Sequence, residues 1–196
     1  MPPERALLPL SIPLSPALPL PLLFKTYTNA IDFRPGPKLN LIIGPNGAGK
    51  SSLVCAICIG LGGAPRLLGR AREVREYVRR GAPGGWVELT LAGGPSSPPT
   101  VVRRDLSAVN NTSTWRLDGL PATPAAVAAC VANLRIQLDN LCQFLPQDRV
   151  ADLARLQPSA LLEETERALG DASLHALHAD LAAAVGEERE ARSRAA

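Results

Sequence analysis

One stretch of the chain has the residue types and spacing that phosphate chemistry requires, namely GPNGAGKS at residues 44–51. It matches the pattern G-x-x-x-x-G-K-[ST], in which glycines let the backbone curl so that its amides face the phosphates of a nucleotide. The lysine of this pattern reaches the β- and γ-phosphates, and the serine hydroxyl coordinates the Mg²⁺ that bridges them. The sequence therefore predicts a site for ATP and Mg²⁺, with Ser51 as a metal ligand and Lys50 as a catalytic residue. The predicted nucleotide-binding residues are Gly44, Pro45, Asn46, Gly47, Ala48, Gly49, Lys50, Ser51 and Ser52.

Two elements must position this loop, a strand before it and a helix after it. Residues 38–43 (KLNLII) end in an almost wholly apolar run, which is typical of a buried parallel strand. Residues 50–61 (KSSLVCAICIGL) predict an apolar helix that Gly62 and Gly63 end. The N-terminus of this helix would add partial positive charge beside the phosphates.

The middle of the chain predicts short strands and one helix. Residues 86–91, 100–104 and 113–117 alternate as half-exposed strands do, and Asp118-Gly119 suits the turn after the third. Thr123 followed by Pro124 predicts an N-cap and the first position of a helix that runs to about Leu134.

The last section predicts two helices separated by Gly170-Asp171. The first begins after Pro158, with Ser159 as a possible cap, and runs to about residue 169. In the second, Leu174, Leu177 and Leu181 follow a three-four spacing, which suggests the start of a coiled coil.

Composition excludes several classes of protein. The 196 residues can bury one core, and no apolar run reaches the roughly 18 residues of a membrane span. The net charge of +3 does not by itself indicate nucleic-acid binding. Four cysteines are too few for a disulfide scaffold, and Cys55 and Cys58 on the predicted helix favour core packing over zinc binding. An intracellular α/β or α+β protein remains.

The chain shows only half of the residues that ATP hydrolysis needs. A complete site also has an acidic residue at the end of an apolar strand, which holds the magnesium and its water. The nearest candidates are VVRRD at 101–105 and RIQLD at 135–139, and polar residues interrupt both. We therefore expect the chain by itself not to turn over ATP at a useful rate.

Two segments indicate the family. FRPGPKLN at 33–40 leads into LIIGPNGAGKSSLVCAI at 41–57, and NLCQFLPQDRV follows at 140–150. Together they resemble the N-terminal ATPase half of a structural maintenance of chromosomes (SMC) protein over about residues 24–196. The resemblance implies an α/β P-loop NTPase fold, the N-terminal lobe of an ABC-type head with a mixed sheet plus helices that run into the start of a coiled coil.

The resemblance also implies roles for two residues outside the loop. Gln147 falls where such heads have a glutamine loop, so it would contact the magnesium and the attacking water as a second catalytic residue. A loop glutamine that bonds only backbone is the alternative. Arg70 lies where many SMC heads place an arginine near the nucleotide.

The resemblance implies partners as well. The acidic strand and signature motif would come from a C-terminal half of the head, and two heads would sandwich two ATP molecules. The partners would be a second SMC subunit in a heterodimer, a kleisin, other non-SMC elements and DNA, with no membrane. The implied work is double-strand break repair by homologous recombination, chromosome organisation and sister chromatid cohesion, in the nucleus and on chromosomes.

The chain departs from the family pattern at its ends. Prolines recur through residues 1–23, so we expect a disordered low-complexity leader that cannot supply the strand that SMC heads have here. We expect residues 24–158 to form the N-terminal half of the head and residues 159–196 the helices that lead into a coiled coil. Since the C-terminal half is not in the chain, we expect a fragment or an incomplete gene model.

Residues 66–80 (RLLGRAREVREYVRR) hold six arginines and two glutamates, a local charge of +4. This basic segment could contact DNA phosphates, with release of counterions favouring the contact. A solvated basic face, or arginines lying over a strand, explains it equally well.

Two other functions remain open. A freestanding P-loop kinase of small metabolites would need an acceptor pocket, a lid and its own acidic residue, none of which is convincing in the sequence. A non-catalytic interaction module would use the leader and the terminal helix, and it would ignore nucleotide.

Overall fold

An antiparallel sheet of six strands forms the base of the fold in the computed structural model, which describes residues 21–23, 31–36, 38–69, 71–92, 98–170 and 172–195. The strands lie in the order β2-β1-β3-β4-β5-β6, and every neighbouring pair is antiparallel. Their bounds are β1 (Pro21–Leu23), β2 (Ile31–Asp32), β3 (Gly84–Leu91), β4 (Thr100–Ser107), β5 (Ser113–Leu117) and β6 (Leu120–Ala122).

The three strands expected in the middle of the chain are confirmed as β3, β4 and β5. Val87 lies opposite Arg104, and Arg104 lies opposite Trp115, so these residues share one face of the sheet. The turn from β5 to β6 is the expected Asp118-Gly119, with φ angles of 49° and 81°. Two successive left-handed residues are what a two-residue hairpin turn requires.

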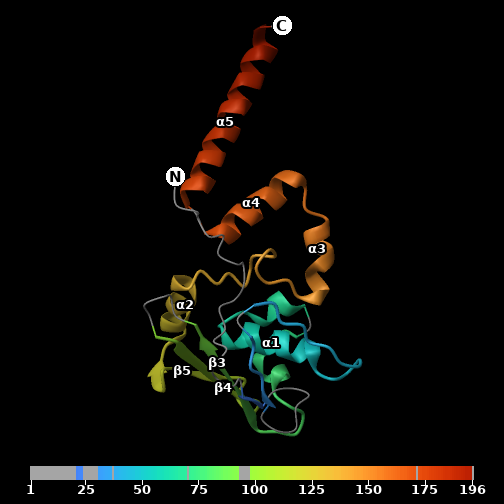
Figure 1. The fold of residues 1–196 in the computed structure, drawn as a ribbon, viewed down its shortest axis with the longest axis vertical. Helices are drawn as coiled ribbons and strands as arrows, with labels where there is room; N and C mark the ends of the chain where they lie inside the picture. Colours follow the sequence, from blue (N-terminus) through green and yellow to red (C-terminus); the bar gives the residue numbers. More distant parts are fainter. Residues whose placement is uncertain are drawn as a thin grey trace.

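The helix α1 (Lys50–Gly60) lies across the sheet and packs on β3 (Figure 1). Its apolar residues are buried because one side of the helix packs on the sheet and the other side packs on the irregular segments that follow the helix. The fully buried apolar residues of this core are Ala56, Cys58, Ile59, Tyr77, Val87, Leu89, Leu91 and Val102. The expected helix and the burial of its two cysteines are confirmed.

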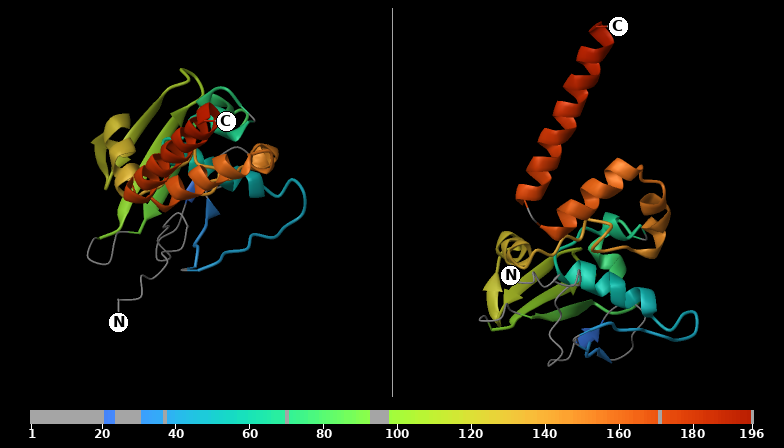
Figure 2. Two further views of the ribbon diagram at one scale, coloured as in Figure 1. Left: turned by 90° about the horizontal axis from the view of Figure 1, so that it is seen from above. Right: turned by 45° about the horizontal axis from the view of Figure 1, so that its top comes forward.

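Short 3₁₀ turns and four more helices complete the fold. The right-hand view of Figure 2 shows α5 extending away from the sheet, with α3 and α4 between them. The elements are η1 (Pro65–Leu68), η2 (Val74–Tyr77), α2 (Pro124–Asn133), η3 (Gln147–Arg149), α3 (Val150–Ala154), α4 (Pro158–Leu169) and α5 (Ala172–Ala195). No helix in the described ranges is both long enough and apolar enough to cross a membrane.

The predicted helix starts are right at α2 and shifted at α4. The Thr123 hydroxyl accepts a 3.2 Å hydrogen bond from the amide of Ala126, which is the expected cap. Helix α4 begins at Pro158, with Gln157 as its N-cap, so Ser159 lies inside the helix. Proline at the first helical position lacks only an amide hydrogen that would have no partner within the helix. Gly170, with φ of 69°, ends α4 as expected, and Asp171 lies outside the described residues.

The predicted strand at 38–43 is wrong. This segment has no regular secondary structure, and Leu39, Leu41 and Ile43 are 96%, 79% and 83% exposed. A parallel strand is stable when neighbouring strands and helices cover it, and the described sheet offers it no pairing partner. Its apolar pattern therefore predicted burial that this chain alone does not provide.

The expectation that the proline-rich beginning cannot supply a strand is wrong for residues 21–23. Leu22 and Leu23 pair with Val87 and Trp86 of β3, so β1 lies between β2 and β3. Pro21 is the first residue of the strand, a position where the missing amide costs little. Residues 1–20 of the expected leader lie outside the described residues, and the expected division into domains stays a prediction.

Candidate nucleotide-binding site

The loop at residues 44–49 is curled between the extended segment and α1. Gly47 and Gly49 have φ angles of 84° and 96°, a left-handed conformation that glycine adopts without steric cost. The amide of Ala48 donates a 3.3 Å hydrogen bond to the carbonyl of Pro45, which closes the turn. Gly49 then caps α1, because its carbonyl accepts bonds from the amides of Ser52 and Leu53 at 2.8 and 3.2 Å.

The side chain of Lys50 lies over this loop. Its Nζ donates hydrogen bonds of 2.6 Å to the carbonyl of Gly44 and 2.8 Å to the carbonyl of Pro45. The ammonium group is therefore held within the curl of the loop, where a phosphate would be bound. A phosphate oxygen could replace a carbonyl as its partner with little movement of the side chain.

The first turn of α1 suits an anion. It holds no acidic residue, and Gly49 offers no side chain to cap the helix. The helix dipole adds partial positive charge at this end. Ser51 is half-buried and Ser52 is buried, so the hydroxyl expected to bind magnesium is the more accessible of the two. The donors present thus fit a magnesium-bound nucleotide: backbone amides, one ammonium and one hydroxyl.

Close packing fixes α1 at its other end. A Cβ on Gly60 would lie 2.7 Å from Cγ1 of Val87 and 2.8 Å from Cδ1 of Leu89, so the helix backbone approaches β3 as only glycine allows. The guanidinium of Arg104 is buried beside the same turn of the helix. Burial lowers the pKa of Arg104 from its ordinary 12.5 to about 10, so the group keeps its charge at pH 7. No local sequence pattern indicated this buried arginine.

Gln147 lies on a separate element from the loop. It is exposed at the start of η3, directly after the buried Pro146. Its neighbour Asp148 touches the end of η1, because a Cβ on Gly69 would lie 3.2 Å from Cβ of Asp148. The segment of Gln147 therefore lies against the end of η1. Arg70 lies outside the described residues.

The basic segment, residues 66–80, is folded against this region. The carboxylate of Glu76 accepts bonds from the amides of Arg72 and Glu73 at 3.0 and 2.9 Å. The amide of Arg75 donates a 3.0 Å bond to Asn111 in the turn between β4 and β5. These bonds hold the backbone of the segment just before η2 and at its second residue.

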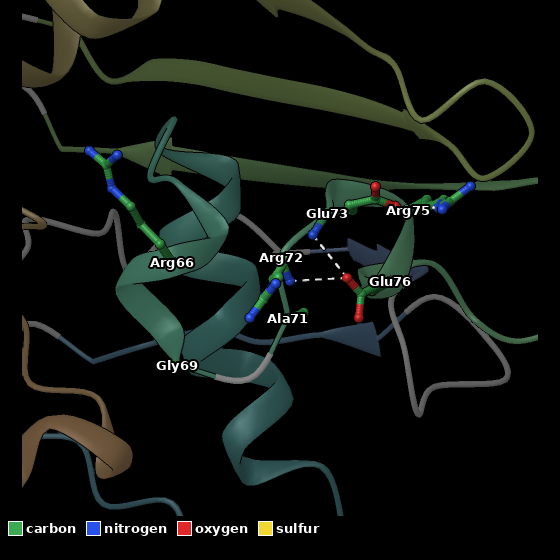
Figure 3. Close-up of a pocket in the computed structure, with 7 residues that line it drawn as sticks. All are labelled: Arg66, Gly69, Ala71, Arg72, Glu73, Arg75 and Glu76. Carbon is green, nitrogen blue, oxygen red and sulfur yellow. Dashed lines mark hydrogen bonds and ion pairs between the residues drawn. The ribbon is translucent and has the colours of Figure 1, made fainter.

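A cavity of about 670 Å³ opens along the basic segment, lined by Arg66, Gly69, Ala71, Arg72, Glu73, Arg75 and Glu76. Figure 3 shows Arg66 pointing away from Arg72 and Glu76, and Arg75 forms an ion pair with Glu73. The arginines point in different directions and do not converge on one small ligand. Such an arrangement suits contact with an extended surface. In the described ranges, no three acidic, histidine or cysteine side chains group as metal ligands.

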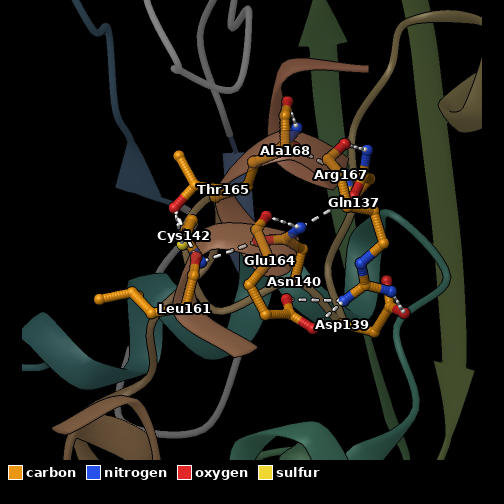
Figure 4. A network of polar contacts seen from close by, with 10 residues as sticks. Gln137, Asp139, Asn140, Cys142, Leu161, Glu164, Thr165, Arg167 and Ala168 are labelled. Atoms are coloured by element: carbon orange, nitrogen blue, oxygen red, sulfur yellow. Dashed lines mark hydrogen bonds and ion pairs between the residues drawn. The ribbon is translucent and has the colours of Figure 1, made fainter. Parts of the chain in front are cut away.

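The segment before Gln147 makes contacts that the sequence did not predict. Residues 137–143 bind the C-terminal end of α4 through their side chains (Figure 4). Local patterns could not reveal these bonds, because they join residues 24 to 30 positions apart.

Comparisons with known proteins agree with this geometry. The model of a family described as an AAA domain matches residues 24–180. The chain is 45% identical over 155 residues to structural maintenance of chromosomes protein 5 of Arabidopsis thaliana, covering 79% of this chain. It is 41% identical over 167 residues to the protein of the same name from Schizosaccharomyces pombe, covering 85% of this chain. The match spans 14% and 15% of those two relatives.

Solved structures show the same fold. A structure described as an SMC ATPase, in work on ATP-driven dimerization and DNA-stimulated activation, matches 76% of this chain and 98% of its own, with a TM-score of 0.65 at 21% identity. An Smc head domain with an extended coiled coil, derived from Pyrococcus furiosus and bound to the C-terminal domain of ScpA, matches 74% of this chain and 40% of its own. Its TM-score is 0.62 at 21% identity. The expected α/β fold of an SMC head lobe is confirmed, but the sheet of the described residues is antiparallel and not mixed as expected.

Proposed function

The chain belongs to the AAA domain family, and on that basis we propose that it is the ATP-binding N-terminal head segment of an SMC subunit. The observation that carries the proposal is the position of Lys50, whose Nζ is held by Gly44 and Pro45 within the curled loop. A lysine fixed there by its own loop is ready to bind β- and γ-phosphate oxygens.

The residues of the site have distinct tasks. The amides of the loop and of the first turn of α1 bind phosphate oxygens, and Lys50 balances their charge. The hydroxyl of Ser51 and the side-chain amide of Gln147 would hold Mg²⁺. Magnesium held there would supply positive charge to offset the charge that develops on the phosphates. In the intact site Gln147 would also orient the water that attacks the γ-phosphate.

The exposed segment at residues 38–43 supports a composite site. The chain spans only 14–15% of the relatives it matches at 45% and 41% identity, so the activity of the whole protein is part of the proposal. We infer that the C-terminal half of the head covers Leu39, Leu41 and Ile43, and that the segment then becomes a strand. That half would supply the acidic strand and the signature motif.

The partners follow from the same relatives. One solved Smc head is bound to part of ScpA, which supports a kleisin partner for this subunit. A second SMC subunit would complete each ATP site, and other non-SMC elements would join them. Double-strand break repair, sister chromatid cohesion and a place on chromosomes in the nucleus are the finer parts of this proposal.

DNA engagement is assigned to the basic segment. Arg66, Arg72, Arg79 and Arg80 are exposed there, and hydrogen bonds hold the backbone amides of Arg72 and Arg75. Charged side chains on a fixed backbone can contact several phosphates of a duplex at once.

An assay of the purified chain with Mg²⁺-ATP separates this function from its two alternatives. A head segment binds ATP and releases almost no phosphate by itself. A small-metabolite kinase would transfer the γ-phosphate to an acceptor in a metabolite mixture, and an interaction module would not bind nucleotide. Binding without turnover supports the proposal, and either of the other results overturns it.

A further inference from the structure

Helix α5 meets the rest of the fold near its beginning. Among the side chains of α5 that the structure describes, His178 is half-buried and every other one is exposed. The element on which α5 packs is α4. Beyond this contact, Figure 1 shows α5 leading away from the sheet. The direction of the whole helix therefore depends on a small contact between its first turns and α4.

The centre of this contact is an acid and a histidine. Oε2 of Glu166 on α4 lies 3.0 Å from Nδ1 of His178 on α5. Glu166 is buried, with 7% of its surface exposed, while 31% of the His178 side chain is exposed. A carboxylate that is removed from water needs hydrogen-bond donors, because a buried charge without them is costly. His178 can supply such a donor across the gap between the two helices.

A short turn joins the two helices. Gly170 caps the C-terminal end of α4 with a left-handed φ of 69°, and α5 begins at Ala172. A Cβ on Gly170 would lie 3.3 Å from Cδ of Arg135, so the turn itself is packed against the fold. A few residues between two helices are enough to absorb a change of direction. The turn thus fixes where α5 starts, and the contact of His178 with Glu166 fixes where it points.

Protonation of the histidine changes the strength of this contact. An ionised carboxylate only accepts hydrogen bonds, so Nδ1 must carry a proton in order to donate. Neutral imidazole has one proton on either nitrogen, whereas imidazolium has a proton on both and a positive charge. A charge-assisted hydrogen bond is roughly twice as strong as a neutral one. Because histidine changes charge between pH 5 and 8, the contact should strengthen as the pH falls through that range.

Other charged groups lie near this contact along the chain. They are Glu163, Glu164 and Arg167 on α4, Asp180 on α5 and Arg135 just after α2. Carboxylates and guanidinium groups ordinarily keep their charge between pH 6 and 8. Asp171 and the side chain of His175 lie outside those that the structure describes. His175 is the second of the two histidines in the chain, which makes it the natural control.

We propose that the His178–Glu166 pair is a pH-sensitive device that holds α5 in one direction relative to α4 when His178 is protonated. When the histidine is neutral, the helix moves over a wider range of directions. Both residues are positioning residues, since they act on the direction of α5. The device needs no nucleotide, so it stands or falls independently of the proposed function.

Distances between two spin labels on the full chain test the proposal. Labels at Ser159→Cys on α4 and Ser193→Cys on α5, both exposed, report the direction of α5. Cys130→Ser and Cys142→Ser remove the two thiols that are not buried. The population with α5 in its fixed direction, relative to all others, should be about fivefold larger at pH 6 than at pH 8, as when a neutral hydrogen bond becomes charge-assisted.

Three further variants of the labelled chain separate the pair from its surroundings. His178→Phe keeps a ring of similar size without a donor, and Glu166→Gln keeps the shape of the side chain without its charge. In both, the distances should no longer change between pH 6 and 8. His175→Gln, the control, should keep the full response.

Equal distances at both pH values in the labelled chain would overturn the proposal, because a purely structural contact does not respond to pH. A response that persists in both His178→Phe and Glu166→Gln, or that disappears in His175→Gln alone, would also overturn it. Circular dichroism of the same samples should show constant helix content between pH 6 and 8. A loss of helix content parallel to the change in distance would mean that α5 unfolds, and this too would overturn the proposal.

Discussion

The guanidinium of Arg104 donates a 2.8 Å hydrogen bond to the carbonyl of Ile59, in the last turn of α1. Its Nε donates a 3.1 Å bond to the hydroxyl of Ser113, and its Cζ lies 4.4 Å from the centre of the Trp115 ring. A cation at the C-terminus of a helix meets the negative end of the helix dipole. Arg104 therefore links the sheet to the C-terminal end of α1, the helix that carries Lys50 at its N-terminal end.

Replacing this cation should loosen α1. In Arg104→Met the side chain keeps its length, but the hydroxyl of Ser113 loses this donor and the carbonyl of Ile59 keeps only its 3.2 Å bond from the amide of Gly62. We expect a loss of about 2 kcal/mol in the free energy of unfolding, as for the loss of hydrogen bonds from a charged group. Urea denaturation measures it, and Arg116→Met, an exposed arginine of β5, is the control. Equal stability of the two variants would contradict the role of Arg104.

Gly63 should not accept even one methyl group. A Cβ there would lie 2.8 Å from the carbonyl of Cys58 and closer still to its Sγ. Because backbone cannot move aside as a side chain can, Gly63→Ala should cost about 1–3 kcal/mol in the free energy of unfolding. In Gly186→Ala a Cβ would meet nothing within 4 Å on α5, so thermal and urea unfolding should show no loss. Unchanged stability of Gly63→Ala would show that the turn after α1 is not tightly packed.

Cys58 should make stability depend on alkaline pH. Burial, aided by the neighbouring Cys55, raises the pKa of the Cys58 thiol from 9.0 to about 12. The unfolded thiol ionises near pH 9, while the native thiol keeps its proton until about pH 12, so the unfolded state binds fewer protons between these values. Stability therefore falls as the pH rises through this range, by at most about 1.4 kcal/mol per pH unit from this group.

The slope of stability against pH, measured by urea denaturation between pH 8 and 11, checks this effect. In Cys58→Ala the slope should be shallower than in the wild type, whatever the stability of the variant at neutral pH. Identical slopes would mean that the thiol is not buried as the structure has it.

Arg79 and Arg80 should contribute to DNA affinity through charge alone. Both are exposed at the end of the basic segment. If each contacts one phosphate of a duplex, the double variant Arg79→Gln/Arg80→Gln should reduce the slope of log affinity against log salt by about 2. Fluorescence anisotropy with a short duplex measures the slope. The pair Arg192→Gln/Arg194→Gln on α5 is the control, since those arginines form ion pairs with Glu188 and Glu190. Equal slopes for the two double variants would show that the basic segment does not contact DNA.

The sequence predicted those elements whose signals are local. The helix after the loop, the Asp118-Gly119 hairpin and the Thr123 cap each depend on a few adjacent residues, and all are confirmed. The prediction of a strand at 38–43 is wrong, because an apolar pattern indicates that a segment can be buried but not which part of the protein covers it.

The same distinction between local and long-range signals applies to the candidate site. The loop from Gly44 to Ser51 is one local motif, and its Gly47 and Gly49 adopt the left-handed conformation that such a curled loop requires. The side-chain bonds from residues 137–143 to α4 and the contacts of Arg104 depend on residues brought together by the whole fold. For example, 45 positions separate Arg104 from Ile59. No pattern in a single sequence reports such a pairing.

Equilibrium binding of a fluorescent ATP analogue to the chain, with Mg²⁺ present, tests the central claim most directly. We predict saturable binding by the wild type and a loss of about 30-fold or more in affinity in Lys50→Ala, as expected when a charged group loses a phosphate contact. Lys38→Ala should bind as the wild type does, since that lysine is exposed on the segment before the loop. Equal affinities of Lys50→Ala and the wild type, or no binding by the wild type, would contradict a phosphate site at this loop.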